Sequence, residues 1–179
     1  GIIFFPLLGA IISGFFGKKI GYKYSQILTS LFIFISSILS CLIFFHVVTQ
    51  EYSSNKLIFN WISSGDFKIN WSIHVDSLTS VMLVVVSSIS TIIHFYSIGY
   101  MSNDPHKPRF MAYLSLFTFS MLVLVTADNF LQLFFGWEGV GLCSYLLIGF
   151  WYKKPSANSA AIKAFIVNRV GDFAFAIGI

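Results

Sequence analysis

The feature that most constrains the fold is a series of long apolar runs separated by short polar segments. A helix needs about 20 predominantly apolar residues to cross the hydrocarbon core of a bilayer. Hydrophobic residues make up 56% of the 179 positions and charged residues only 10%, a balance that a water-soluble domain could not solvate. We therefore predict an all-α, polytopic transmembrane helix bundle. Its six candidate spans are roughly 2–16, 26–49, 75–99, 110–127, 129–152 and 159–179.

The first run is short, contains Pro6, and has no basic residues ahead of it, so it lacks the charged start of a signal peptide. We read it as a genuine span that is clipped at its beginning. The chain opens at Gly1 without Met and stops at Ile179 inside the apolar stretch FAFAIGI. We expect residues 1–179 to be a single transmembrane domain within a longer protein.

The segments between the runs alternate in charge. Three of them, which would lie on one side of the membrane, carry seven basic residues: Lys18, Lys19 and Lys23, then Lys107 and Arg109, then Lys153 and Lys154. The longer loop predicted for 50–73 has Lys56 and Lys68 beside Glu51 and Asp66, and the remaining connection is a tight turn at Asp128 and Asn129. The positive-inside rule places the first side in the cytoplasm or mitochondrial matrix. The N-terminus would then face the periplasm or intermembrane space.

Several function classes find no support in the sequence. Basic residues clustered in loops suit membrane topology better than a nucleic-acid surface, so we expect no nucleic-acid partner. Cys41 and Cys143 lie in separate apolar runs without metal-ligand spacing. The chain also has no dinucleotide-binding glycine pattern and no iron–sulfur cysteine set, so we expect neither a metal nor a redox cofactor on it.

Four ionisable residues fall well inside predicted spans: Glu138, Lys163, Arg169 and Asp172. An ionised side chain in hydrocarbon costs several kcal/mol or more unless something compensates it. Intramembrane charges typically mark routes for substrates or protons, so charges of both signs on two successive spans favour a polar path. The alternative is a self-neutralising pair that only fixes helix packing.

The positions of these residues predict which of them share a depth. Spans five and six should run antiparallel around a turn near Pro155, and Glu138 and Asp172 are each seventeen residues from it. At about 1.5 Å per residue both lie roughly 25 Å from the turn. Arg169 is three residues before Asp172, close enough for an ion pair along the helix. Lys163 is shallower and about 180° around the helix from Asp172, so it should face a different neighbour.

Glu138 lies in the segment GWEGVGLCSYLLIGFWY, with no basic partner within one turn of its own helix. Its partner must come from elsewhere, or the carboxyl must be protonated part of the time. A desolvated carboxyl beside a mobile cation can alternate between the two states, as a proton-loading site requires. Gly136, Gly139 and Gly141 permit either a close helix approach or a local distortion there.

The histidines are less informative. His94 and His46 could each relay protons, but an interfacial polar tip is the favoured interpretation. His74 precedes Asp76 at the start of span three. These two residues could form a polar cluster opposite the basic side, or Asp76 could simply cap the helix.

Longer stretches show a family resemblance. The segments DNFLQLFFGWEGVGLCSYLLIGFWY, AAIKAFIVNRVGDFAF, IHVDSLTSVMLVVV and YMSNDPHKPRFMAYLSLFTFSMLVLVT resemble chain 5 of proton-translocating NADH:quinone oxidoreductase, respiratory complex I. The resemblance implies the first six helices of an antiporter-like, inverted-repeat fold. It also implies that Glu138 is the proton-site acid, with a lysine partner on a later helix. Arg169 and Asp172 would belong to the charged path, and Lys163 is a further candidate member of it.

The same resemblance implies a translocase subunit in the mitochondrial inner membrane or the bacterial plasma membrane. NAD, FMN, iron–sulfur clusters and quinone would be bound by other subunits. Its partners would be lipid, protons and the other membrane subunits, especially a neighbouring antiporter-like subunit. Two alternatives remain: the large subunit of a multi-subunit sodium/proton antiporter, and a purely structural membrane subunit.

Overall fold

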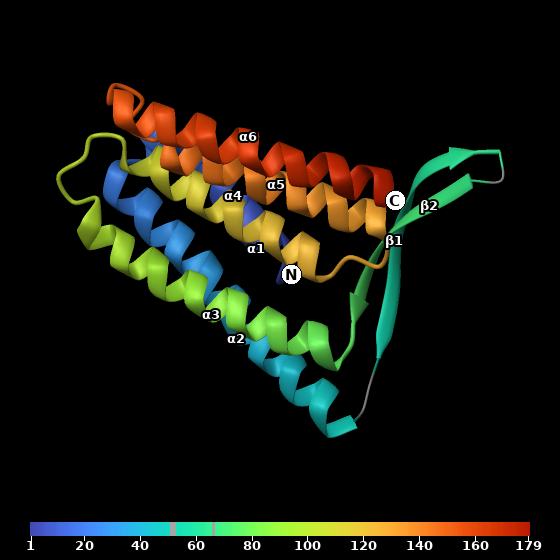
Figure 1. Ribbon diagram of the computed structural model, residues 1–179. Coiled ribbons are helices and arrows are strands. Elements are labelled where there is room, and N and C mark those ends of the chain that lie inside the picture. The colour runs from blue at the N-terminus through green and yellow to red at the C-terminus, as the bar shows by residue number, and fades with distance from the viewer. Residues whose placement is uncertain (51–52, 66) are drawn as a thin grey trace.

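The computed structural model describes residues 1–50, 53–65 and 67–179, and the two acidic residues of the predicted 50–73 loop, Glu51 and Asp66, lie outside them. The described residues form a bundle of helices with one β-hairpin at one end (Figure 1). This confirms the predicted helix bundle. The elements are α1 (Phe4–Ile20), α2 (Tyr22–Gln50), β1 (Ser54–Ser64), β2 (Phe67–Val75), α3 (Ser77–Tyr100), α4 (Lys107–Val125), α5 (Phe130–Ile148) and α6 (Pro155–Gly178).

Most of these helices suit a membrane by length and composition. Helices α2, α3, α4 and α5 are long and apolar enough to cross a bilayer, and α1 is apolar over the shorter range Phe4–Gly17. Helix α6 is 24 residues long but carries three charged side chains. The chain is therefore a multi-pass membrane protein, and membrane crossing by α1 and α6 stays a prediction.

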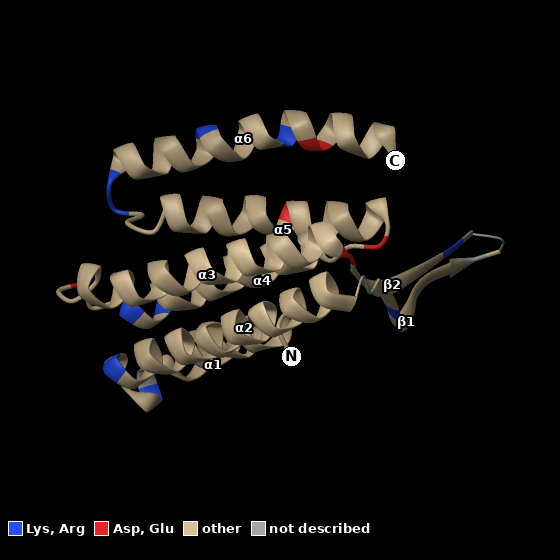
Figure 2. Ribbon diagram, turned by 90° about the horizontal axis from the view of Figure 1, so that it is seen from below, with Lys and Arg blue, Asp and Glu red and all other residues tan. Residues whose placement is uncertain are grey.

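The helices pack in a definite order. Helix α1 lies against α2 and α4, α2 against α3, α4 against α5, and α5 against α6. Helix α6 therefore lies at the outer edge of the bundle (Figure 2). Small polar residues link neighbouring parts of the bundle: the Ser90 and Thr118 hydroxyls of α3 and α4 are 2.5 Å apart, and Ser36 Oγ of α2 donates at 2.7 Å to the carbonyl of Ile2, just before α1.

The predicted loop at 50–73 is wrong over most of its length. Strands β1 and β2 pair antiparallel, with Phe59 opposite Trp71, and Gly65 at their turn has a φ of 57°. The side chain of Gln132 on α5 ties β2 to the bundle: its Nε2 donates to the Ser72 carbonyl at 2.8 Å, and its Oε1 accepts from the Ser72 N–H at 3.2 Å. The hairpin is therefore fastened to the helix that carries Glu138.

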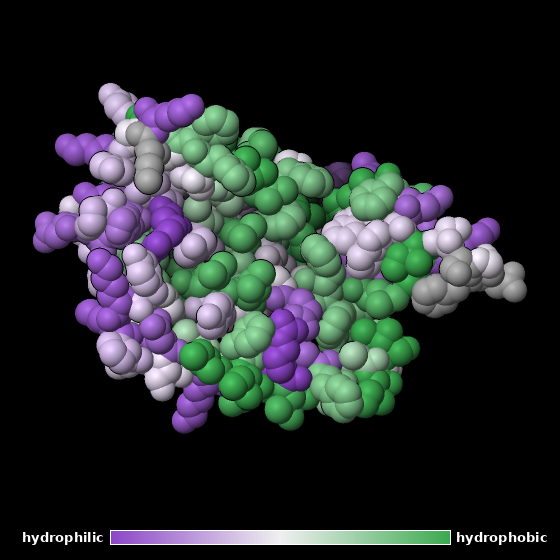
Figure 3. Space-filling view, turned by 90° about the horizontal axis from the view of Figure 1, so that it is seen from above, coloured by the Kyte–Doolittle hydropathy of each residue, from purple (hydrophilic) through white to green (hydrophobic). Residues whose placement is uncertain are grey.

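The two ends of the bundle differ in charge. Lysine and arginine gather at the end where the α1–α2, α3–α4 and α5–α6 connections lie, opposite the hairpin (Figure 2). Hydrophilic residues concentrate at the same end in the space-filling view, and apolar residues cover much of the rest of that face (Figure 3). Exposed apolar side chains along the helix sides, such as Phe15, Ile92 and Val170, suit contact with lipid.

Candidate functional site: a charged cluster between α5 and α6

Helices α5 and α6 form an antiparallel pair joined by residues 149–154. Pro155 begins α6, a position where its missing N–H leaves no helical hydrogen bond unmade. The pairing brings residues 137 and 138 of α5 beside residues 169 and 172 of α6. The predicted common depth of Glu138 and Asp172 is thus confirmed by direct contacts between the two helices.

Arg169 bridges the two carboxylates. Its Nη1 donates to both carboxylate oxygens of Glu138. The same nitrogen lies 3.4 Å from Oδ2 of Asp172, so the predicted pair along α6 is present. The guanidinium also lies over the Phe165 ring, 4.6 Å from its centroid, which restrains the plane of the cation.

Asp172 is the buried member of this cluster. Its side chain is only 9% exposed, against 25% for Glu138 and 45% for Arg169. Its Oδ1 accepts a hydrogen bond from Trp137 Nε1 at 2.7 Å. Trp137 precedes Glu138 in the chain, so two consecutive residues of α5 contact Asp172 and Arg169 of α6. Sequence reasoning missed the role of Trp137, although its indole N–H needs an acceptor when it faces a neighbouring helix.

The partner of Glu138 comes from another helix, as its lack of a basic neighbour on α5 predicts. Within the described residues that partner is Arg169. The resemblance implies a lysine from a later helix, and that lysine stays a prediction. Because Arg169 lies between two acids, the local charge is one cation against two carboxylates.

Two glycines bring α5 against α4. A Cβ placed on Gly136 would lie 2.7 Å from the Leu124 backbone, and one on Gly139 would lie 2.7 Å from Ser120 Oγ. Helix α5 is a continuous α-helix around them. The close approach is therefore confirmed, and the alternative of a local distortion is wrong. With this face of α5 against α4, the side chain of Glu138 reaches α6.

Lys163 lies apart from the charged cluster. Its side chain is exposed and lines a shallow groove on the outer face of α6 with Ile166 and Val167. This agrees with the prediction that it faces a different neighbour from Asp172. The structure therefore brings together Glu138, Arg169 and Asp172, but not Lys163.

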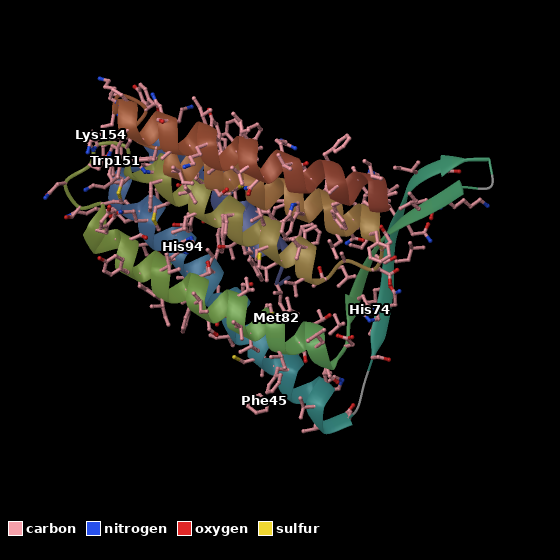
Figure 4. The ribbon with its side chains drawn as sticks, in the orientation of Figure 1. Phe45, His74, Met82, His94, Trp151 and Lys154 are labelled. Atoms are coloured by element: carbon pink, nitrogen blue, oxygen red, sulfur yellow. The ribbon has the colours of Figure 1, made fainter. Side chains whose placement is uncertain are left out.

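The interpretation of His94 as an interfacial polar tip is wrong. The side chain is fully buried and faces α4, in the half of α3 nearer the basic end (Figure 4). Its Nδ1 lies 2.8 Å from the Ser90 carbonyl, and its Nε2 lies 3.1 Å from Ser115 Oγ. Serine partners on both helices therefore satisfy the ring. His46 is exposed on α2, consistent with an interfacial position.

Both interpretations of the His74 region hold. Asp76 caps α3 by accepting from the Thr79 N–H at 2.7 Å, and this hydrogen bond lowers the pKa of Asp76. His74 lies at the base of the hairpin (Figure 4). Its ring nitrogens are 3.7 Å from Asp76 and 3.8 Å from Asp128.

Residues 1–50, 53–65 and 67–179 contain no group of three His, Cys, Asp or Glu side chains that could together hold a metal ion.

Two family models match parts of the chain. Residues 61–111 match the family model for the N-terminus of chain 5 of NADH-ubiquinone oxidoreductase (complex I). Residues 127–179 match the transmembrane model named for NADH:quinone oxidoreductase and the Mrp antiporter. The second match contains the whole charged cluster. Together the two matches cover more than half of the chain.

Individual relatives agree. The chain is 53% identical over 178 residues to NADH-quinone oxidoreductase subunit L of Rickettsia bellii, covering 99% of this chain and 28% of that protein. It is 57% identical over 178 residues to NADH-ubiquinone oxidoreductase chain 5 of Arabidopsis thaliana, covering 99% of this chain and 27% of that protein. The chain thus spans little more than a quarter of the length of these relatives.

A solved structure shows the same fold. The membrane-bound sulfane sulfur reductase, an archaeal respiratory membrane complex, contains a chain that matches with a TM-score of 0.83 at 16% identity, over 99% of this chain and 35% of its own. The helix bundle and the two family matches define a multi-pass membrane protein of the class that those models describe, NADH:quinone oxidoreductase and Mrp antiporter chains. Within that class, the chain belongs to the family of complex I chain 5, also called subunit L.

Proposed function

We propose that this chain is the N-terminal part of a proton-translocating membrane subunit of complex I. The observation that carries the proposal is the bridge formed by Arg169 between Glu138 and Asp172. A cation shared by two acids can favour one or the other. When it moves toward Asp172, Glu138 loses its counter-charge and binds a proton more readily. When it returns, the ionised form of Glu138 is favoured and the proton is released.

The packing supports distinct parts for the two acids. Asp172 is buried and receives the Trp137 hydrogen bond in addition to its contact with Arg169, so its ionised form has two supports. Glu138 is more exposed, and within the described part of the chain it depends on Arg169 for its charge partner. Glu138 is therefore the proton-loading acid, and Asp172 is the fixed anion that can draw Arg169 away.

The redox chemistry, in this proposal, belongs to other subunits of the complex, which bind NAD, FMN, the iron–sulfur clusters and quinone. The partners of this chain are the neighbouring membrane subunits, an antiporter-like subunit among them. The basic end of the bundle faces the cytoplasm or matrix, and the N-terminus faces the periplasm or intermembrane space. Lys163 serves the proton path only if later parts of the protein bring it a partner.

The proposal is tested in the full-length subunit within its assembled complex, by measuring quinone reduction and proton release with and without sodium. Sodium-independent pumping that falls when the charged cluster is neutralised would support a proton-translocating subunit. Sodium-dependent transport would favour the antiporter that the second family model also names. Full pumping after neutralisation would favour a structural subunit. Topology is tested with two cysteine variants. A thiol-reactive probe should label Lys153→Cys from the cytoplasmic or matrix side and Lys56→Cys from the other side.

A further inference from the structure

A second polar feature lies at the basic end of the bundle, away from the charged cluster. A cavity of about 420 Å³ opens between α4, α5 and α6. Trp151 and Lys154 mark the same end of the molecule in Figure 4. Its wall includes Arg109, Tyr113, Tyr145, Leu146, Asn158 and Ile162.

Arg109 is held firmly in this wall. Its Nη2 donates to the Phe150 carbonyl at 2.9 Å, and its guanidinium lies 4.7 Å from the centroid of the Phe150 ring and 5.5 Å from that of Tyr152. Its Nε is buried and has no hydrogen-bond acceptor among the described residues. In the same part of the chain no carboxylate lies within ion-pair distance of Arg109. The structure thus fixes a partly desolvated cation without a contacting anion.

Asp104, whose pKa is lowered in part by the charge of Arg109, has hydrogen-bond partners of its own. Asp104 Oδ1 accepts from the His106 N–H at 2.7 Å, and its Oδ2 accepts from Trp151 Nε1 at 3.0 Å. Burial raises the pKa of Asp104, but these hydrogen bonds and the nearby charges of His106 and Arg109 outweigh it and lower the pKa overall. Asp104 therefore stays ionised and weakens the positive field, yet neither of its oxygens contacts Arg109.

The surroundings of the cavity also favour an anion. Lys107 begins α4, two residues before Arg109, and Lys153 and Lys154 lie in the α5–α6 connection at the same end of the bundle. Asn158, in the first turn of α6, lines the cavity, so the partial positive charge of that helix terminus adds to the field. The N–H donors of a guanidinium match the oxygens of a phosphate. Tyr113 and Tyr145 also line the cavity, and a tyrosine hydroxyl can donate a further hydrogen bond.

We propose that this cavity binds the phosphate group of an anionic phospholipid. The apolar members of the wall favour a lipid over free phosphate: Leu146 and Ile162 lie beside the polar groups, and Ile162 is also 52% exposed on the surface of α6. Ile166, one turn further along α6, is 58% exposed and extends this apolar surface toward the bundle's middle. Basic pockets between helices on the cytoplasmic or matrix side are suited to such headgroups.

The test uses the full-length subunit in its assembled complex, stripped of loosely held lipid by detergent. Binding of radiolabelled phosphatidylglycerol is compared between the unmodified protein, Arg109→Gln, and the control Lys107→Gln, which removes a neighbouring cation that does not line the cavity. Arg109→Gln should lower occupancy at least about tenfold, because charge-assisted hydrogen bonds are lost. Lys107→Gln should change it much less. Equal binding by the unmodified protein and Arg109→Gln would overturn the proposal.

Arg109 also supports the Phe150 carbonyl, so its replacement could weaken assembly. Leu146→Trp keeps Arg109 and fills the cavity, and it should also exclude the lipid; lipid binding that survives in this variant would contradict the site. Labelled phosphatidylcholine should bind more weakly than phosphatidylglycerol, and equal binding would remove the charge argument. Inorganic phosphate at millimolar concentration should not displace the lipid. Displacement would make free phosphate the occupant and overturn the lipid assignment.

Discussion

Trp137 and Arg169 hold opposite oxygens of Asp172: the indole N–H donates to Oδ1 at 2.7 Å, and the guanidinium Nη1 lies 3.4 Å from Oδ2. The indole comes from α5 and the guanidinium from α6, so the acid is fixed from two helices. The same guanidinium contacts Glu138. Any change at Asp172 should therefore reach Glu138 through Arg169.

Trp137→Phe should remove the hydrogen bond that holds Asp172 without changing any charge in the cluster. The substitution keeps an aromatic ring but removes the donor to Asp172, leaving a buried carboxylate with one hydrogen bond fewer. We expect a loss of about 1–3 kcal/mol in the free energy of unfolding. The measurement is thermal or denaturant unfolding of the full-length subunit in detergent. Trp151→Phe is the control, because its hydrogen bond goes to the exposed side of the bundle at Asp104. Equal losses in both variants would contradict the special position of Trp137.

Asp172→Asn should act on charge more than on shape. The amide oxygen can still accept from Trp137, but Arg169 then has only Glu138 as a charge partner within the described part of the chain. Arg169 then stays beside Glu138 and stabilises its ionised carboxylate, so Glu138 should take up a proton more slowly. We expect assembly to persist and proton pumping to fall several-fold, by analogy with the loss of a charge-assisted hydrogen bond. Unchanged pumping in an assembled Asp172→Asn complex would remove Asp172 from the path.

Gly136→Ala should disturb the contact between α4 and α5. The added methyl would lie 2.7 Å from backbone atoms of Leu124, which cannot move aside as a side-chain end can. Overpacking of this kind costs about 1–3 kcal/mol. Gly99→Ala is the matched control, because a Cβ at this helical position meets nothing within 4 Å. Unfolding midpoints of both variants test the difference, and a Gly136→Ala protein as stable as Gly99→Ala would show that the helices are not held this closely.

His94→Leu should destabilise the α3–α4 interface. The ring Nδ1–H donates to the Ser90 carbonyl and Nε2 accepts from the Ser115 hydroxyl, and leucine would leave that buried hydroxyl without this partner. A cost of about 1–3 kcal/mol in the free energy of unfolding is expected. His46→Leu, on the exposed side of α2, should cost far less. Similar unfolding curves for both histidine variants would support the interfacial interpretation that the structure has replaced.

The Asp76 cap should make stability depend on pH. Its pKa is lowered from the ordinary value of 3.8, so its ionised form contributes stability above that value, and the contribution is lost as the pH falls through the lowered pKa. The amide in Asp76→Asn does not titrate, so this variant should be less stable than the unmodified subunit near about pH 6 and approach it near about pH 3. The measurement is the free energy of unfolding of both proteins across this range. A stability difference that stays constant with pH would contradict the cap's part in it.

Much of the fold could be predicted because apolar run length is a direct consequence of bilayer thickness. The hairpin was missed because its strands carry fewer apolar residues than the spans, although Gly65 between two runs rich in Ile, Phe and Trp is a turn signal. His94 was misplaced because position along a span gives depth but not rotation. A stripe formed by Ser87, Thr91 and His94 at helical spacing was the available signal.

The charged site could be predicted only in part. Spacing around one turn gave the common depth of Glu138 and Asp172, and i, i+3 spacing gave the pair of Arg169 with Asp172. The contact between Glu138 and Arg169 depends on how two helices are rotated about their axes. That rotation follows from the packing of Gly136 and Gly139 against α4, which no single helix sequence contains.

The central claim is that Glu138 exchanges a proton rather than only pairing with Arg169. Glu138→Gln keeps the size and hydrogen-bonding ability of the side chain but removes the exchangeable carboxyl proton. Glu138→Asp, which keeps the carboxyl on a shorter side chain, is the companion variant and should retain part of the activity. The deciding measurement is the number of protons translocated per electron pair by the assembled complex in reconstituted vesicles. We predict that Glu138→Gln assembles and translocates fewer protons per electron pair, and normal translocation by an assembled Glu138→Gln complex would contradict the account.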